Sequence, residues 1–295
     1  MDSYKEINFK YGMPNQVTPL IRRIIAKNPS KFTFHGTGTY IIGKGQVAVI
    51  DPGPLIPEHI NSILTSTQNE KITHIFITHT HKDHSEATSY LKEVTQAKTY
   101  GFGPHAKSNS NINDENEESG DFSFIPDIYL KDLQIIKTDN WTIQSLYTPG
   151  HCSNHLCFKL IDENIIFSGD HIMGWSTTVV SPPDGNMSDY MKSLYKISNL
   201  ESKNLFPTHG PPILEPKKYI DKLIKHRIKR ENQILETLAS GAKDLEELLS
   251  IIYINTDKSL HKAAKRSLLA QLLFLIEKNK IKKVSISASS IYKII

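Results

Sequence analysis

The 295-residue sequence has few cysteines and no long apolar segment. Only Cys152 and Cys157 occur, which argues against a disulfide-stabilised fold and suits a reducing compartment. A run of about 18 or more apolar residues is absent, so we expect no membrane-spanning helix and no membrane partner. The N-terminal residues MDSYKEIN also lack the apolar core of a secretory signal. We therefore expect a cytoplasmic protein.

The composition is that of a globular protein whose charge is unevenly distributed. Hydrophobic residues make up 38% and charged residues 22% of the chain, enough for a substantial core in one or two domains. The net charge is +4, but residues 217–295 hold 17 Lys and Arg against 8 Asp and Glu, a net charge of +9. We predict domains at residues 1–216 and 217–295 and expect the basic C-terminal part to face a polyanion.

The part before residue 216 alternates short apolar runs with segments of helical spacing. The expected strands are 32–34, 38–43, 47–50, 72–78, 98–102, 129–130, 141–148, 156–161, 164–168 and 204–207. The expected helices are 58–67, 87–94 and 190–200. Residues 108–121 are polar and acidic and are predicted to form an exposed loop. The alternation indicates an α/β layered fold.

The C-terminal part changes to helical texture. The expected helices are 218–238, 244–253 and 260–279, the second capped by Asp244 or a neighbouring residue. Residues 281–284 and 289–294 then alternate like a small hairpin. Helices followed by a two-stranded wing are the order expected of a small winged-helix-like domain.

The segment Thr78–Ser85, THTHKDHS, holds four potential metal ligands directly after an apolar run. His79 and His81 are two residues apart, so in an extended segment both side chains point to the same side. Asp83 and His84 follow where the chain must turn, and they can face a second point. Burying such a cluster is costly unless something coordinates it. The segment therefore predicts the beginning of two metal sites.

Three later points repeat this form, because an apolar run ends and a potential ligand follows. His151 comes after a Pro-Gly turn, Asp170 follows Phe167-Ser168-Gly169, and His209 follows Phe206-Pro207-Thr208. Each ligand is therefore expected at the tip of a strand, where it can complete the sites begun by the histidine cluster.

The motif H-x-H-x-D-H, followed by a His, an Asp and a His at strand tips, resembles the metallo-β-lactamase superfamily over residues 30–215. The resemblance implies an αββα sandwich, two sheets between helices. It also implies the ligands: His79, His81 and His151 for one metal, Asp83, His84 and His209 for the other, and Asp170 as the bridge. The implied cofactors are two Zn²⁺ ions, with Mn²⁺ or Fe²⁺ left open because no Cys is among the ligands.

The implied activity is hydrolysis by a hydroxide that bridges the two metals. Asp83 would orient this hydroxide as well as bind metal. His155 contacts substrate, protonates the leaving group or is structural, and His171 either supports the site beside Asp170 or is structural. The loop residues Trp175, Ser176 and Thr177 are candidate substrate contacts, with simple packing as the alternative.

Within the superfamily, the sequence is most similar to the mitochondrial β-lactamase-like endoribonucleases and their bacterial relatives. The shared features are Gly169-Asp170-His171-Ile172-Met173-Gly174, His209-Gly210-Pro211 and the winged-helix-like tail. This resemblance implies cleavage of single-stranded RNA, with the basic tail attracting phosphates. A glyoxalase II-like thioesterase, a mononuclear-iron persulfide dioxygenase and a non-catalytic nucleic-acid-binding protein remain alternatives. The expected substrate is thus an ester, thioester or phosphodiester.

Overall fold

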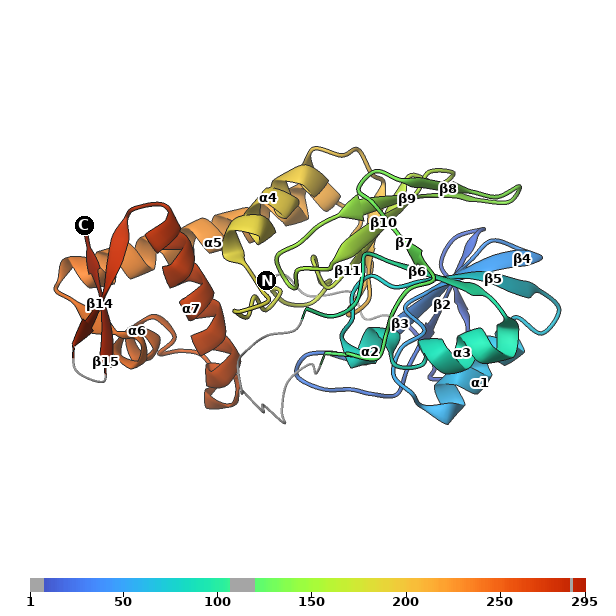
Figure 1. Cartoon of the computed structure of the whole chain (residues 1–295), viewed down its shortest axis with the longest axis horizontal. Coiled ribbons are helices and arrows are strands. Elements are labelled where there is room, and N and C mark those ends of the chain that lie inside the picture. Colours follow the sequence, from blue (N-terminus) through green and yellow to red (C-terminus); the bar gives the residue numbers. More distant parts are fainter. Residues whose placement is uncertain (1–7, 107–119, 287–288) are drawn as a thin grey trace. The chain divides into compact units, whose positions relative to one another are not determined.

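The computed structural model describes residues 8–106, 120–286 and 289–295, and Figure 1 shows its elements. The predicted loop at 108–121 lies, for residues 108–119, outside the described residues. Contacts divide the chain into two units: residues up to Thr148 with 154–176 and 201–216, and residues 149–153 and 177–200 with 217–295. The predicted domain limits stay a prediction, because contacts do not show whether either part folds by itself.

The first unit contains a seven-stranded sheet whose strands follow one another in chain order. The strands are β1 (Asn15–Gln16), β2 (Ile21–Ile25), β3 (Gly38–Ile42), β4 (Gln46–Ile50), β5 (Lys71–Phe76), β6 (Lys98–Gly101) and β7 (Ile128–Tyr129). Neighbours from β1 to β4 pair antiparallel, whereas neighbours from β4 to β7 pair in parallel. The carboxyl ends of the parallel strands therefore meet at one edge of the sheet.

A second, five-stranded sheet in the same unit has the order β12-β11-β10-β9-β8. The strands are β8 (Ile135–Lys137), β9 (Thr142–Tyr147), β10 (Leu156–Leu160), β11 (Ile165–Gly169) and β12 (Asn204–Pro207). The pair β11–β12 is parallel and the others are antiparallel. The residues that follow β11 and β12, Asp170 and Thr208-His209, therefore leave the sheet at the same edge.

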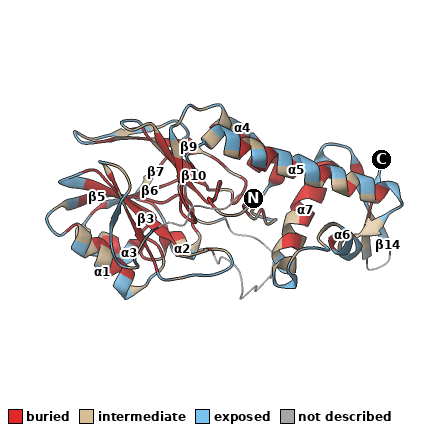
Figure 2. Cartoon of the chain, turned by 180° about the vertical axis from the view of Figure 1, so that it is seen from behind, coloured by how far each residue is buried: buried red, intermediate tan, exposed pale blue. Residues whose placement is uncertain are grey.

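Alternate residues of β3 enter two different cores. Tyr40 and Ile42 pack in a cluster with Phe158 and Phe167 of the second sheet. Ile41, which points the other way, packs with side chains of α1 (Pro57–Ser66) and α3 (Thr88–Thr95). The two sheets are therefore stacked face to face, with helices on the outer face of the first, and Figure 2 shows buried residues along the strands of both sheets.

The prediction of a strand at 32–34 is wrong, because Phe32 and Thr33 lie in a turn and Phe34 forms only an isolated bridge with Ser30. The Ser30 Oγ accepts the N–H groups of Phe32 and Thr33 at 3.0 Å each, and Phe34 has a left-handed backbone with φ 59°. A hydroxyl that bonds nearby backbone N–H groups stabilises a turn in place of a strand.

The second unit has its own apolar core. Its elements are α4 (Met187–Ser198), α5 (Pro216–Ala239), β13 (Lys243–Asp244), α6 (Leu245–Ile252), the 3₁₀ turn η1 (Lys258–Leu260), α7 (His261–Glu277), β14 (Ile281–Ile286) and β15 (Ser289–Ile294). Leu248, Leu268 and Tyr292 join three of them in one cluster. Asp244 caps α6 as predicted, and Glu247 completes the capping box. Among the described residues, no helix combines the length and apolar character that a membrane crossing requires.

Candidate metal centre

The histidine cluster lies at the edge where the parallel strands of the first sheet end. The chain leaves β5 at Phe76, and His79 and His81 lie in the loop before the short helix α2 (Lys82–Ser85). Asp83 and His84 belong to α2 itself, so the turn from extended chain to helix separates the two pairs of ligands. His79 and His84, one from each pair, also form a group of possible ligands with Asp170.

Asp51, the residue after β4, holds His84 in place. Its Oδ1 accepts the N–H of Thr78 at 2.8 Å, and its Oδ2 accepts the Nδ1–H of His84 at 2.8 Å. The hydroxyls of Thr78 and Thr208 donate to the same Oδ2, at 2.7 and 3.1 Å. Because Nδ1 is held by a carboxylate, the Nε2 of His84 faces away from Asp51, the usual arrangement behind a metal-binding histidine.

His209 is fixed in a similar way, on the loop after β12. Its Nδ1 donates to the carbonyl of Gly36 at 3.2 Å, so its Nε2 also points to the centre. The buried guanidinium of Arg23 donates to the carbonyls of Thr208 and Gly210, at 3.0 and 2.9 Å, on either side of His209. The loop that carries this imidazole is thus held by backbone contacts as well as by its own ring.

Four buried polar atoms face one another at short range: Asp83 Oδ2, His84 Nε2, Asp170 Oδ1 and His209 Nε2. Asp83 Oδ2 lies 3.2 Å from His209 Nε2 and 3.5 Å from His84 Nε2. Asp170 Oδ1 lies 3.5 Å from each of these imidazole nitrogens. A point about 2.1 Å from the corners of a tetrahedron with such edges has the spacing of Zn²⁺ to nitrogen and oxygen ligands. The donor set therefore fits a divalent cation.

The shifted pKa values of these side chains also favour a bound divalent cation. Burial by itself raises the pKa of Asp83, but His84 and His209 outweigh it and lower the pKa to about 2. Burial by itself lowers the pKa of His84, but Asp83, Asp170 and Asp51 raise it well above its ordinary value. The pKa of His209 is raised against its burial by Asp170 and Asp83. Carboxylates that stabilise extra positive charge on a buried imidazole also attract a metal cation to this point.

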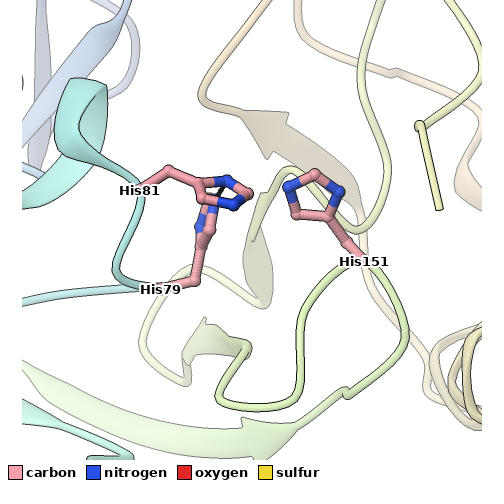
Figure 3. A group of neighbouring side chains, drawn as sticks. All are labelled: His79, His81 and His151. Atoms are coloured by element: carbon pink, nitrogen blue, oxygen red, sulfur yellow. Dashed lines mark hydrogen bonds between the residues drawn. The ribbon is translucent and has the colours of Figure 1, made fainter. Parts of the chain in front are cut away.

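A second group consists of His79, His81 and His151, the last on the turn between β9 and β10. Each offers one ring nitrogen, and these nitrogens lie within 4.8 Å of one another. Figure 3 shows the rings of His79 and His81 side by side and the ring of His151 turned toward them. The Nε2 of His79 and the Nδ1 of His81 are 2.9 Å apart. The Nδ1 of His151 donates to the carbonyl of Val179 at 2.7 Å.

The other candidate residues have different surroundings. His155 is buried, its Nδ1 lies 2.9 Å from the Thr148 hydroxyl, and its Nε2 accepts the N–H groups of Asp170 and His171 at 3.2 Å each. His171 is buried with its ring 6.0 Å from that of His155. Among the loop residues, Trp175 stacks on Phe34, with ring centroids 5.0 Å apart.

Ser176 and Thr177, the other two loop residues, are partly exposed.

The sequence analysis does not identify Asp51 and Arg23 as functional residues, although they position His84 and the loop of His209. A signal for Asp51 exists, because it follows the apolar strand 47–50 just as Asp170 follows 164–168. Its contact with His84, 33 residues away, depends on the parallel pairing of β4 with β5. For Arg23 the sequence offers no signal, since its partners lie more than 180 residues along the chain.

Comparisons with known proteins give matches over both parts of the chain. A family model described as the metallo-β-lactamase superfamily matches residues 33–209, and one described as the β-lactamase associated winged helix domain matches residues 245–288. A β-lactamase-like protein 2 homolog from Caenorhabditis elegans is 34% identical over 246 residues, which cover 81% of this chain and 77% of that protein.

Two further matches are a protein named as a thioesterase and a protein of known structure. An atrochrysone carboxyl ACP thioesterase from Cryptosporiopsis sp. is 29% identical over 226 residues, 76% of this chain and 64% of that protein, so this chain spans less than two thirds of the thioesterase. A β-lactamase domain protein from Burkholderia ambifaria superposes with a TM-score of 0.80 at 17% identity, over 98% of this chain and 96% of the other. At this identity the superposition shows a shared fold.

Proposed function

This chain belongs to the metallo-β-lactamase superfamily, and from this premise we propose that it is a hydrolase that works with two metal ions held by seven side chains. The observation that carries the proposal is the group of buried, mutually facing donors from Asp83, His84, Asp170 and His209, 3.2 to 3.5 Å apart. Such a group is costly to bury unless a cation compensates it.

The possible ligands divide between two ions. His79, His81 and His151 would hold one ion, and Asp83, His84 and His209 the other. Asp170 lies in one group with His79, a ligand of the first ion, and His84, a ligand of the second, and would bridge the ions. Imidazole and carboxylate donors favour Zn²⁺, and Mn²⁺ or Fe²⁺ use the same ligands.

Two divalent ions held by these side chains would supply an activated water and would stabilise negative charge on a carbonyl or phosphoryl oxygen. The protein's own part is to fix the donors. The Asp83 carboxylate, whose pKa is lowered, would accept a hydrogen bond from the attacking water and orient it. His155 accepts the N–H groups of Asp170 and His171, so it holds the backbone that carries the bridging carboxylate. We assign His155 to positioning, since both of its ring nitrogens have partners inside the protein.

The first candidate substrate is single-stranded RNA, supported by the distribution of positive charge. Lys218, Lys222, Lys225 and Lys229 are exposed and lie on one side of α5, at positions i, i+4, i+7 and i+11. The first three of them border a hollow of about 430 Å³ together with Lys217 and Asp221. Lysines grouped on one face attract the phosphates of a nucleic acid strand.

A second candidate is a thioester. The relatives that match this chain include a protein named as an acyl-carrier-protein thioesterase, and a carbonyl can occupy the same dinuclear centre as a phosphodiester. The α5 lysines give no preference here, because they act on phosphate charge.

Metal analysis and parallel assays test the proposal. We expect about two metal ions per chain and loss of hydrolysis after chelation, restored by Zn²⁺ or Mn²⁺. Replacing the four exposed α5 lysines by Gln should weaken RNA binding and reduce the slope of log K against log salt by roughly 3, since each single-strand phosphate contact contributes about 0.7. Replacement by Arg keeps the charge and is the matched control. Hydrolysis that survives complete metal removal would contradict the proposal.

A further inference from the structure

Phe34 and Trp175 form a stacked aromatic pair beside the loop that carries His209. Their ring centroids are 5.0 Å apart, their planes differ by 17°, and both residues are partly exposed. They come from distant segments, the turn before β3 and the loop after β11. A parallel pair of rings presents flat faces, the geometry on which another planar ring can stack.

Backbone contacts place this pair next to the metal centre. The carbonyl of Gly36, two residues after Phe34, accepts the Nδ1–H of His209. On the other side, the N–H of Gly174, the residue before Trp175, donates to the carbonyl of His209 at 3.0 Å. The two segments that carry the rings are thus hydrogen-bonded to the same histidine, one to its side chain and one to its backbone.

The conformation of Phe34 argues for a role beyond packing. Its φ of 59° lies in the left-handed region, which is unfavourable for a bulky residue and is readily adopted by Gly or Asn. The turn is held by the Phe34 N–H to Ser30 carbonyl bond at 3.0 Å and by the Tyr11 hydroxyl, which donates to the His35 carbonyl at 2.7 Å. Strain that the surroundings enforce in this way is concentrated at functional sites.

We propose that the Phe34–Trp175 pair determines specificity by stacking on a flat, unsaturated ring of the substrate, next to the bond that is hydrolysed. The inference rests on the proposed hydrolase function and narrows its substrate class. The ring is a nucleobase if the substrate is RNA, or an aromatic acyl group if it is a thioester. A saturated or ring-free substrate gains no stacking at this surface.

Ligand binding, measured by tryptophan fluorescence, tests the pair separately from catalysis. Trp175 can report on a bound ring, because the chain has only two tryptophans and the other, Trp141, is buried in the core. If the substrate is RNA, we expect uridine 5′-monophosphate to change the tryptophan fluorescence of the metal-loaded protein and ribose 5-phosphate to leave it unchanged. If the substrate is a thioester, we expect the same contrast between 2-naphthoate and decanoate. In the Trp175→Phe variant the change should disappear, while in Trp141→Phe it should persist. Equal responses to ring-bearing and ring-free probes would overturn the proposal.

Kinetics of Phe34→Asn supply the second measurement. Asn tolerates the left-handed backbone, so we expect thermal stability to be kept or raised while kcat/KM falls about tenfold for oligouridylate or for a naphthoyl thioester of N-acetylcysteamine. An abasic oligonucleotide and the acetyl thioester should lose less than threefold. If Phe34→Asn lost the same factor in kcat/KM on every substrate, the stacking role would be refuted and the proposed hydrolase function would stand. If the unaltered protein hydrolysed none of these substrates, the proposed function itself would be refuted.

Discussion

Two kinds of buried histidine occur in the first unit, and they differ in what faces them. His84 and His209 face carboxylates, and these raise their pKa values against the effect of burial. His59 is buried and His74 is half-buried, and burial lowers the pKa of both, that of His59 to about 4. Burial alone therefore does not identify a ligand. The neighbouring carboxylate does, because it makes positive charge favourable at that point.

The largest expected effect comes from exchanging one histidine of each kind for glutamine. His209→Gln removes a donor that faces Asp83 and Asp170, so we expect loss of metal and a fall in kcat of about three orders of magnitude. His59→Gln is the matched control and should keep both metal content and activity at neutral pH. Metal analysis and initial rates check this, and equal metal content in the two variants would break the comparison.

We expect a smaller loss from Asp51→Asn, because Asp51 hydrogen-bonds the candidate ligand His84. The amide cannot accept all three donors that now converge on Oδ2, from His84, Thr78 and Thr208. We expect metal affinity to fall by about 10- to 100-fold, with the rate largely recovered at saturating metal. Titration with Zn²⁺ in a competing chelator measures this. Asp127→Asn is the control, because Asp127 also accepts several hydrogen bonds but from Thr99 and Lys92, outside the centre.

The sequence predicted the parts of the structure whose signals are local. The α/β superfamily fold and the winged-helix domain are confirmed. Asp244 caps α6 as predicted, because a capping box needs only residues three apart. The seven ligand candidates share a recognisable form, a polar residue after an apolar strand, and the structure brings them into the groups described. Their individual roles as ligands stay a prediction.

The features that the sequence could not predict depend on how strands pair and on strained turns. Asp51 meets His84 because β4 lies parallel to β5, and Arg23 reaches Thr208 across 185 residues from a strand that was not predicted. Phe34 follows two residues of strand-like composition, but the Ser30 hydroxyl captures the backbone N–H groups that a strand would need. Such competition between local contacts is decided by tertiary structure.

The pH dependence of folding gives a third prediction, because a histidine with a lowered pKa destabilises the fold in acid. The unfolded chain binds the His59 proton near pH 6.5, while the folded state binds it near pH 4, where burial has moved the pKa. Stability is therefore full above about pH 6.5 and falls as the pH drops toward 4. We expect this single group to cost about 2 kcal/mol between pH 7 and pH 5. Urea unfolding of His59→Gln should show a correspondingly flatter profile, and an unchanged profile would contradict the assignment.

The smallest expected effect comes from Thr39, whose hydroxyl joins the two environments. It donates to the carbonyl of Asp51 at 2.6 Å and lies 2.8 Å from the Nε2 of His59. Because that proton goes to Asp51, the Nε2 of His59 must be the donor in the second contact. Thr39→Val keeps the shape but removes both bonds, so we expect a loss of about 1 kcal/mol in the free energy of unfolding. Thr39→Ser should restore it.

Activity of Thr39→Val separates structural support from positioning of the centre. The Asp51 carboxylate keeps its bonds to Thr78 and Thr208 in this variant, so metal affinity and kcat should change by less than about threefold. A fall in metal affinity as large as that of Asp51→Asn would mean that the core around His59 is coupled to the metal ligands. The two classes of buried histidine would then belong to one network, and the carboxylate alone would no longer distinguish them.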